Sequence, residues 1–217
     1  MLKTLIRNII NPPDVSDVLY RDPAVNIWSN LAYAAVGAAY IYHGLSLERF
    51  SASLCIITGI ALCVLAFGSW RMHAANIRIN VALDHVGMNF TFLSLACFLL
   101  DPFIGGNGYA AILLIVLLLA VNYWVGYTRY LGGGVEFSRP RSLLVIAGCA
   151  PALFILLFLN SWQAALLTTL IFGIAFLFHD RGKPTATGFG ALHSIWHLLT
   201  AKGLLIPLLY RMSWFIF

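Results

Sequence analysis

Two histidines stand four residues apart in the apolar run near the C-terminus, where the sequence reads HSIWH. His193 and His197 would share one face of a helix, because residues four apart are neighbours on its surface. A second pair with this spacing, Ser69 and His73, ends an earlier apolar run at GSWRMH. The next run starts with NVALDHVGM and places Asp84 in its first turns. Imidazole and carboxylate groups at such positions could hold a metal or move protons.

Three imidazoles with one open coordination position are typical of catalytic zinc, whereas structural zinc is usually closed by four protein ligands. His73, His193 and His197 are therefore the predicted ligands. A metal held this way can activate a water for attack on a carbonyl group and can polarise that carbonyl. Asp84 is predicted to be the general base that deprotonates the water and passes the proton to the leaving group. Ser69 is predicted to donate a hydrogen bond to the developing oxyanion.

Other polar residues in or near the apolar runs have less specific interpretations. His43 is interpreted as a packing residue, and His85 points away from its neighbour Asp84 and is interpreted as supporting or packing. His179 and Asp180 could form a surface pair or a gate. Lys202 could snorkel to the interface or bind an anionic group, and we favour snorkelling.

The composition is that of an integral membrane protein. Of the 217 residues, 61% are hydrophobic and 10% are charged, with a mean hydropathy of +0.88, whereas soluble domains carry about 25% charged residues. The four cysteines lie in apolar runs without a Cys-x-x-Cys pair, so neither disulfides nor a thiolate metal site is predicted. The basic residues are spread over loops, so no nucleic-acid partner is predicted, and no protein partner is evident.

A transmembrane helix needs about 20 mostly apolar residues. Runs of this kind predict an all-α, seven-transmembrane helix bundle forming a single domain over 1–217, preceded by a short amphipathic or irregular segment at 1–24. No signal peptide is predicted there. The predicted spans cover residues 25–45, 52–74, 82–100, 108–127, 142–159, 162–179 and 188–210.

The distribution of Lys and Arg predicts the orientation. One side of the membrane receives ten of them and the other side three, counting Lys202 as outer. By the positive-inside rule the richer side, which includes the N-terminus, is cytoplasmic. The ten are Lys3, Arg7, Arg21, Arg71, Arg78, Arg129, Arg139, Arg141, Arg181 and Lys183, against Arg49, Lys202 and Arg211. With this orientation all five residues of the predicted site fall at one depth, near the cytoplasmic face.

These motifs resemble the signature of the CREST superfamily of membrane hydrolases. The similarity comprises Ser69-x-x-x-His73, Asp84 eleven residues later, His193-x-x-x-His197 on the seventh span, and NIWSN at the start of the first span. HSIWHLLT is most similar to alkaline ceramidases, whereas LDHVGM and the cytoplasmic N-terminus resemble the adipoQ-receptor and haemolysin-III branch. The resemblance implies a seven-helix bundle with zinc on the three histidines and the same roles for Asp84 and Ser69.

Alkaline ceramidases also bind calcium through an acidic cluster around the start of their first helix. This chain offers Asp14, Asp17 and Asp22 there, but Pro23 stands where an acidic residue is expected, which speaks against a calcium site.

The leading hypothesis is a zinc-dependent intramembrane hydrolase of a lipid amide, ceramide or an N-acyl relative, in sphingolipid metabolism. The substrate would be a membrane lipid that enters laterally, because the loops are too short to build an external pocket. Two alternatives stay open: a zinc-dependent phospholipid or acyl-ester hydrolase, and a non-enzymatic seven-helix receptor with structural zinc. The compact loops favour a multi-pass protein of a bacterial inner membrane, with the zinc site toward the cytoplasm.

Overall fold

The computed structural model describes residues 23–47, 50–75, 78–104, 153–182 and 190–211, together with the single helical positions 112, 116 and 120. Within these ranges the chain is helical and has no strand, which confirms the all-α prediction. The rest of the predicted span 108–127, most of 142–159 and the segment 1–22 lie outside the described residues.

The helices follow the predicted apolar runs closely. Their bounds are α2 Ala24–Ser29, α3 Leu31–Ser46, α4 Phe50–Ala74, α5 Arg78–Ile104, α8 Trp162–Arg181 and α9 His193–Arg211, and residues 153–160 are also helical. The first predicted span differs, because it is divided at Asn30 into α2 and α3. α5 begins before the predicted span and extends beyond it, into the polar residues of both flanking loops.

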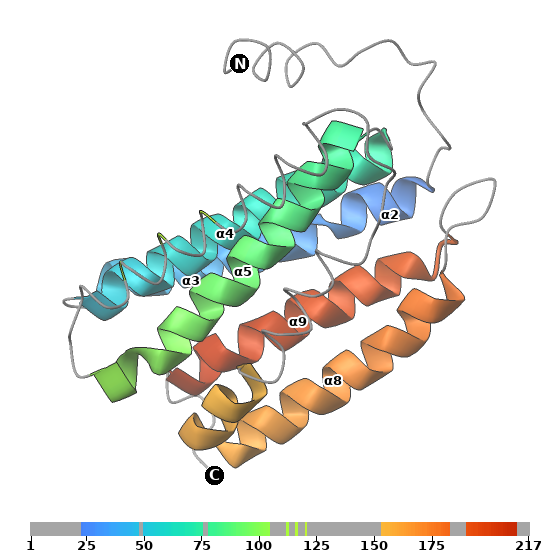
Figure 1. Cartoon of the computed structure of the whole chain (residues 1–217). Helices are drawn as coiled ribbons and strands as arrows, with labels where there is room; N and C mark the ends of the chain where they lie inside the picture. The colour runs from blue at the N-terminus through green and yellow to red at the C-terminus, as the bar shows by residue number, and fades with distance from the viewer. Residues whose placement is uncertain are drawn as a thin grey trace, which may run out of the picture.

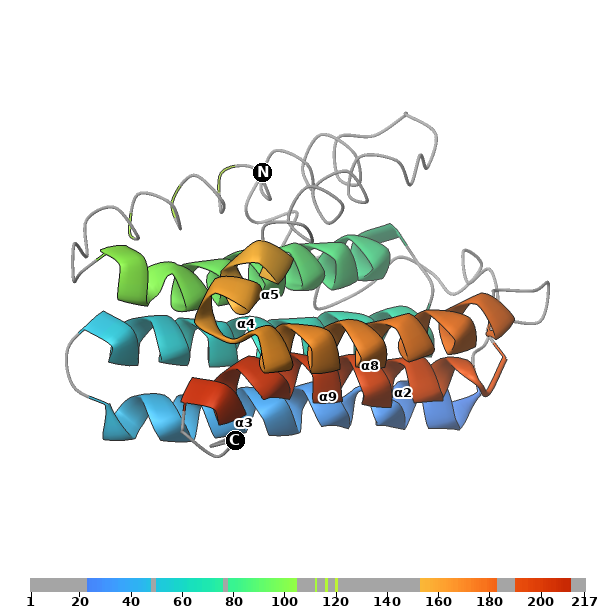
Figure 2. The same ribbon diagram turned by 90° about the horizontal axis from the view of Figure 1, so that it is seen from below.

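Three of the helices are long and apolar enough to cross a membrane: Ala52–Ala74 of α4, Leu83–Phe103 of α5 and Trp162–His179 of α8. These segments bear out the membrane prediction. α3 has 16 residues, although α2 and α3 follow one another in line (Figure 2). α9 has 19 residues but carries Lys202 and two histidines, which lower its hydropathy.

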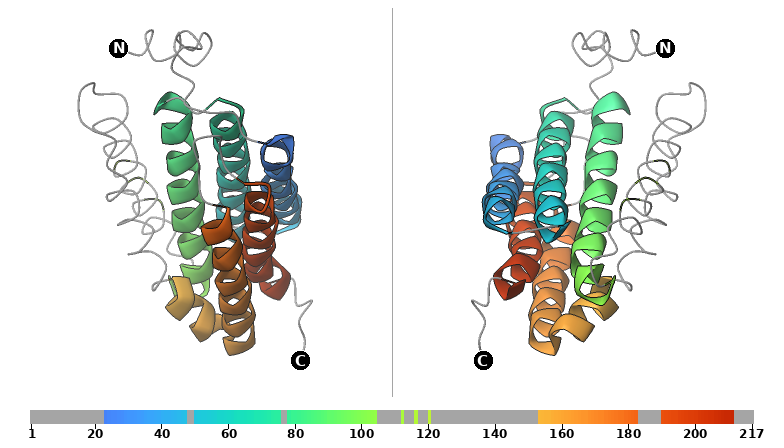
Figure 3. Two further views of the ribbon diagram at one scale, coloured as in Figure 1. Left: turned by 90° about the vertical axis from the view of Figure 1, so that its right-hand side faces the viewer. Right: turned by 90° about the vertical axis from the view of Figure 1, so that its left-hand side faces the viewer.

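The helices form an up-and-down bundle. α4 packs between α3 and α5, and α9 packs between α3 and α8 (Figures 1 and 3). α8 lies at the edge of the described bundle, and apolar side chains such as Leu166, Leu170 and Phe176 are exposed along it. Exposed apolar side chains on a transmembrane helix are the expected contact surface for lipid acyl chains.

The buried interior has an apolar half and a polar half. Tyr40, Phe98, Leu99, Leu204 and Leu208 belong to the apolar core between α3, α5 and α9. Buried polar side chains gather where α2, α5 and α9 begin and α4 ends, namely Asn26, Ser29, Asn30, Ser69, His73, Asn80, Asp84, His193, Ser194, His197 and Thr200. Because burying unpaired polar groups is costly, this concentration at one end indicates a site rather than a packing core.

Candidate metal centre

The three histidines predicted as ligands lie together in the polar half of the bundle. One ring nitrogen from each of His73, His193 and His197 lies within 4.8 Å of the others, and all three side chains are buried. The ring centroids are 5.1 Å apart for His73 and His193, 4.8 Å for His73 and His197, and 4.7 Å for His193 and His197. Residues more than a hundred positions apart in the sequence therefore meet at one point.

The donor set fits a divalent metal. Zn–N bonds of about 2.05 Å at tetrahedral angles place ligand nitrogens about 3.3 Å apart. The Nε2 atoms of His73 and His197 are 3.2 Å apart, which agrees with this spacing. Among the described residues these three histidines form the one cluster of metal-ligating type. Imidazole nitrogens suit zinc, copper, iron and nickel, so the geometry supports a metal without identifying it.

His73 lies in the last turn of α4, and Asn80 holds that helix end. The Asn80 Nδ2 donates to the backbone carbonyls of Arg71 at 3.1 Å and Ala75 at 2.6 Å, and its Oδ1 accepts from Arg71 Nε at 3.3 Å. The last carbonyls of a helix have no partner within the helix and need an outside donor. Asn80 supplies that donor from the start of α5 and so fixes the position of His73.

His193 is the first residue of α9, and Gly182, directly after α8, lies close to it. A Cβ atom on Gly182 would lie 2.7 Å from the His193 backbone nitrogen and 2.9 Å from its Cα. No other residue type fits without moving one of the two segments. Gly182 therefore sets how closely the end of α8 approaches the first ligand on α9.

His197 is fixed by the first span. The Ser29 Oγ lies 2.8 Å from His197 Nδ1, and both groups are buried. A hydrogen bond on the outward nitrogen of a ligating histidine is the usual support for a metal site. Tyr33 adds to this contact, because its ring packs edge-on to the His197 ring at 5.9 Å and its hydroxyl bonds Thr200, one turn further along α9.

Asp84 is buried beside the triad, as expected for the predicted general base. It faces His73 and His85 closely enough for their charges to act on it, and the Ser69 hydroxyl is its hydrogen-bond partner. The approach of α4 and α5 depends on Gly68, because a Cβ there would lie 2.6 Å from the Leu83 backbone and 2.7 Å from the Asp84 nitrogen. A hydroxyl has one proton, so the bond to Asp84 competes with the donation to an oxyanion that the sequence predicts for Ser69.

The remaining polar residues fall into different surroundings. His85 is half-buried on α5 and acts electrostatically on Asp84, and His43 is half-buried at the end of α3. The His179 ring lies 5.5 Å from that of His193 and 4.8 Å from that of Trp196, so it borders the metal centre instead of standing at a separate surface. Lys202 is exposed on α9, and the side chain of Asp180 lies outside the described residues.

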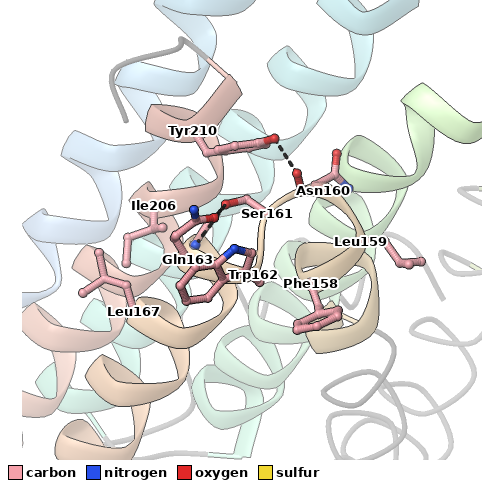
Figure 4. Close-up of a pocket in the computed structure, with 10 residues that line it drawn as sticks. Phe158, Leu159, Asn160, Ser161, Trp162, Gln163, Leu167, Ile206 and Tyr210 are labelled. Atoms are coloured by element: carbon pink, nitrogen blue, oxygen red, sulfur yellow. Dashed lines mark hydrogen bonds between the residues drawn. The ribbon is translucent and has the colours of Figure 1, made fainter. Parts of the chain in front are cut away.

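A cavity of about 410 Å³ lies at the opposite end of α8 and α9. Its polar groups bond mainly to one another or to the backbone. Tyr210 donates to the Asn160 carbonyl (Figure 4), and the Asn160 side chain donates to the carbonyls of Leu99 and Leu156. The side chains of Ser161 and Gln163 bond each other at 3.1 Å. No titratable or metal-ligating cluster lines this cavity among the described residues, so the chemistry of the chain is expected at the histidines.

Comparison with known proteins assigns neither a family nor a function to the chain. No model of a known protein family matches the chain, and no curated protein matches it. The resemblance to the CREST superfamily therefore stays an expectation drawn from the short motifs.

Sequence reasoning did not assign roles to Ser29, Tyr33, Asn80 or Gly182. Ser29 lies within NIWSN, which the resemblance singled out as a motif. A polar residue in an apolar run is a signal for such a role, but its partner His197 is 168 positions away. Asn80 stands where the chain enters a span, and Gly182 is one of many glycines, so neither carried a comparable signal.

Proposed function

We propose that this protein is a zinc-dependent hydrolase that cleaves the amide bond of a membrane lipid, ceramide or an N-acyl relative. The observation that carries the proposal is a buried carboxylate, Asp84, beside three buried histidines whose nitrogens lie within 4.8 Å of one another. A purely structural metal site has no need of a fourth, acidic group left outside the ligand set. The resemblance to alkaline ceramidases in HSIWHLLT supports the choice of substrate.

His73, His193 and His197 would hold the ion, and a zinc ion bound there supplies Lewis acidity. Asp84 takes a proton from the attacking water, whose oxygen forms the new bond to the amide carbon. The carboxyl group of Asp84 then delivers that proton to the amide nitrogen as the C–N bond breaks. The products are a fatty acid and a sphingoid base, or the corresponding amine.

Ser69 has a place in this scheme through Asp84. Its hydroxyl bonds the carboxylate and keeps it directed toward the site. Once Asp84 has accepted a proton, that carboxyl group can act as a donor itself, and the Ser69 proton becomes available to the oxyanion. Both roles use the same hydroxyl at different stages of the reaction.

The substrate is proposed to enter from the bilayer. The apolar side chains exposed along α8 would contact lipid acyl chains, and His179 near the end of α8 lies beside His193 and Trp196 of α9. The seven-span architecture, the cytoplasmic N-terminus and the position of the metal centre on the cytoplasmic side of a bacterial inner membrane are part of the same proposal. The excess of Lys and Arg on one side supports them.

Metal analysis of the purified protein, combined with hydrolysis assays, tests the proposal. We expect one zinc per chain and release of fatty acid from a ceramide panel, with His197→Ala losing both metal and activity. A parallel panel of phospholipids and acyl esters separates amide from ester cleavage. Absence of stoichiometric zinc from the wild-type protein, or full activity in Asp84→Asn, contradicts the proposal that the protein is a zinc-dependent hydrolase. If zinc is required only for folding, the receptor alternative is favoured.

A further inference from the structure

The first span is interrupted at the depth of the metal centre. α2 ends at Ser29 and α3 begins at Leu31. The backbone N–H of Asn30 bonds the Trp28 carbonyl, and the Tyr33 N–H bonds the Asn30 carbonyl at 3.1 Å. In a regular α-helix the Asn30 N–H would bond the carbonyl of Asn26. The interruption therefore releases a backbone acceptor in the buried interior.

Side chains occupy the released carbonyl. The Asn26 oxygen accepts from Asn30 Nδ2 at 2.9 Å and from Ser29 Oγ at 3.0 Å. The Ser29 Oγ also lies 2.8 Å from Nδ1 of the His197 ring. One nitrogen of His197 thus faces a hydroxyl group that is itself bonded to the released carbonyl.

This arrangement selects one tautomer of the imidazole. The single proton of Ser29 is donated to the Asn26 carbonyl, so Nδ1 must carry a proton to bond the Ser29 oxygen. In the other tautomer a bare nitrogen lone pair would face that oxygen in a buried, low-dielectric setting, which is unfavourable. In a neutral ring with the proton on Nδ1, the Nε2 atom has a free lone pair.

That free lone pair points where a ligand is needed. The Nε2 atom of His197 lies 3.2 Å from Nε2 of His73, within the cluster formed with His193. The alternative tautomer would direct an N–H into the cluster and remove one of its three donors.

We propose that the interruption between α2 and α3 is a positioning device for the metal centre. The Ser29 hydroxyl, oriented by its bond to the Asn26 carbonyl, holds the proton of His197 on Nδ1 and so presents Nε2 to a divalent metal. The proposal rests on the metal-binding part of the proposed function, but the tautomer is a property of the metal-free protein. Ser29 is a positioning residue, because it acts through His197.

Nitrogen-15 NMR of the full chain with labelled histidine, metal-free in detergent micelles at pH 8, measures the tautomer. The chain has six histidines, and the His197 signals are those lost in His197→Ala. We expect a protonated, pyrrole-type Nδ1 and an unprotonated, pyridine-type Nε2. The reverse pattern overturns the proposal.

Zinc affinity provides the second measurement, by competition with a chromophoric chelator. Removing a hydrogen-bond partner of a ligating histidine typically weakens metal binding by about 10- to 100-fold. We expect Ser29→Ala to weaken zinc binding about 10-fold and Ser29→Thr, which keeps the hydroxyl, to bind within about twofold of wild type. Ser94→Ala is the matched control, because Ser94 is a buried serine on α5 whose hydroxyl donates to the Thr91 carbonyl at 3.1 Å.

Unchanged zinc affinity in Ser29→Ala overturns the role of Ser29. If the wild-type chain binds no zinc, the proposed function fails, while the NMR measurement on the metal-free chain still decides the tautomer. A thermal melt of each variant separates loss of affinity from loss of fold.

Discussion

Asp84 is a carboxylate buried in a membrane-spanning helix, and such a group is expensive to insert into a bilayer. Its surroundings offset this cost: the Ser69 hydroxyl bonds it, and His73 and His85 lie near it. His73 is also one of the three histidines of the candidate metal centre. The carboxylate is therefore placed next to the ligands without being one of the clustered donors.

Replacing Asp84 by asparagine separates catalysis from metal binding. We expect Asp84→Asn to reduce amide hydrolysis by about 10²- to 10⁴-fold, the usual contribution of a general base, while zinc content stays at the wild-type level. Asp101→Asn is the control, because Asp101 pairs with Arg211 at 3.2 Å in the other half of the bundle. A variant that loses zinc together with activity would instead make Asp84 a ligand.

At the scale of elements, the residues of the candidate metal centre are positioned mainly by contacts at helix ends and by places where two helices approach closely. Asn80 caps the end of α4 next to His73, and the interrupted first span supplies Ser29 to His197. Gly68 allows α4 and α5 to meet beside Asp84, and Gly182 allows the chain leaving α8 to meet α9 at His193. Small residues at such contacts are a common way of bringing transmembrane helices together.

A methyl group at Gly182 should displace the backbone of His193 and so disturb the candidate metal centre. We expect Gly182→Ala to weaken zinc binding by roughly 5- to 150-fold, the equivalent of the roughly 1–3 kcal/mol that overpacking typically costs. Gly173→Ala, within α8, is the control, because a Cβ there meets no atom within 4 Å. Competition with a chelator measures both affinities, and equal values for the two variants would show that this contact does not position His193.

At the scale of the whole molecule, the described helices and the clustering of the histidines could be predicted, because hydropathy and four-residue spacing are local properties of the sequence. α4 ends at Ala74 and α8 ends at Arg181, both close to the predicted limits. The interruption at Asn30 could not be predicted, since it depends on side-chain hydrogen bonds that take the place of a backbone hydrogen bond at the Asn26 carbonyl. The contacts of Ser29 with His197 and of Tyr33 with Thr200 depend on how the first and last described helices dock.

Bound metal should stabilise the assembled bundle. A ligand at one hundred times its dissociation constant stabilises a folded protein by about 2.7 kcal/mol. We therefore expect chelation to lower the Tm of the purified protein and added zinc to restore it. His197→Ala should melt at a temperature that zinc does not change. A chelator-insensitive wild-type protein would argue against zinc binding by the folded state.

The orientation can be read by labelling cysteines placed at exposed helix ends. Ala74 is exposed at the end of α4 near His73, and Leu45 is exposed near the end of α3 at the opposite end of the bundle. We expect a membrane-impermeant thiol reagent to label Ala74→Cys only from the cytoplasmic side and Leu45→Cys only from the outer side. The parent protein is the control for its own cysteines, two of which, Cys55 and Cys97, are buried. The reverse pattern would place the centre on the outer side.

The residues that make α9 useful for chemistry also make it a poor membrane segment by itself. α9 is not among the three described helices that are apolar enough to cross a bilayer unaided, and it carries His193, His197 and Lys202. Polar residues at membrane depth are tolerated when neighbouring protein covers them. Biogenesis should therefore be ordered: α9 is expected to integrate efficiently only after α2 to α5 are in the membrane to receive its polar face, so the centre is completed by the last of these helices to leave the translocation machinery.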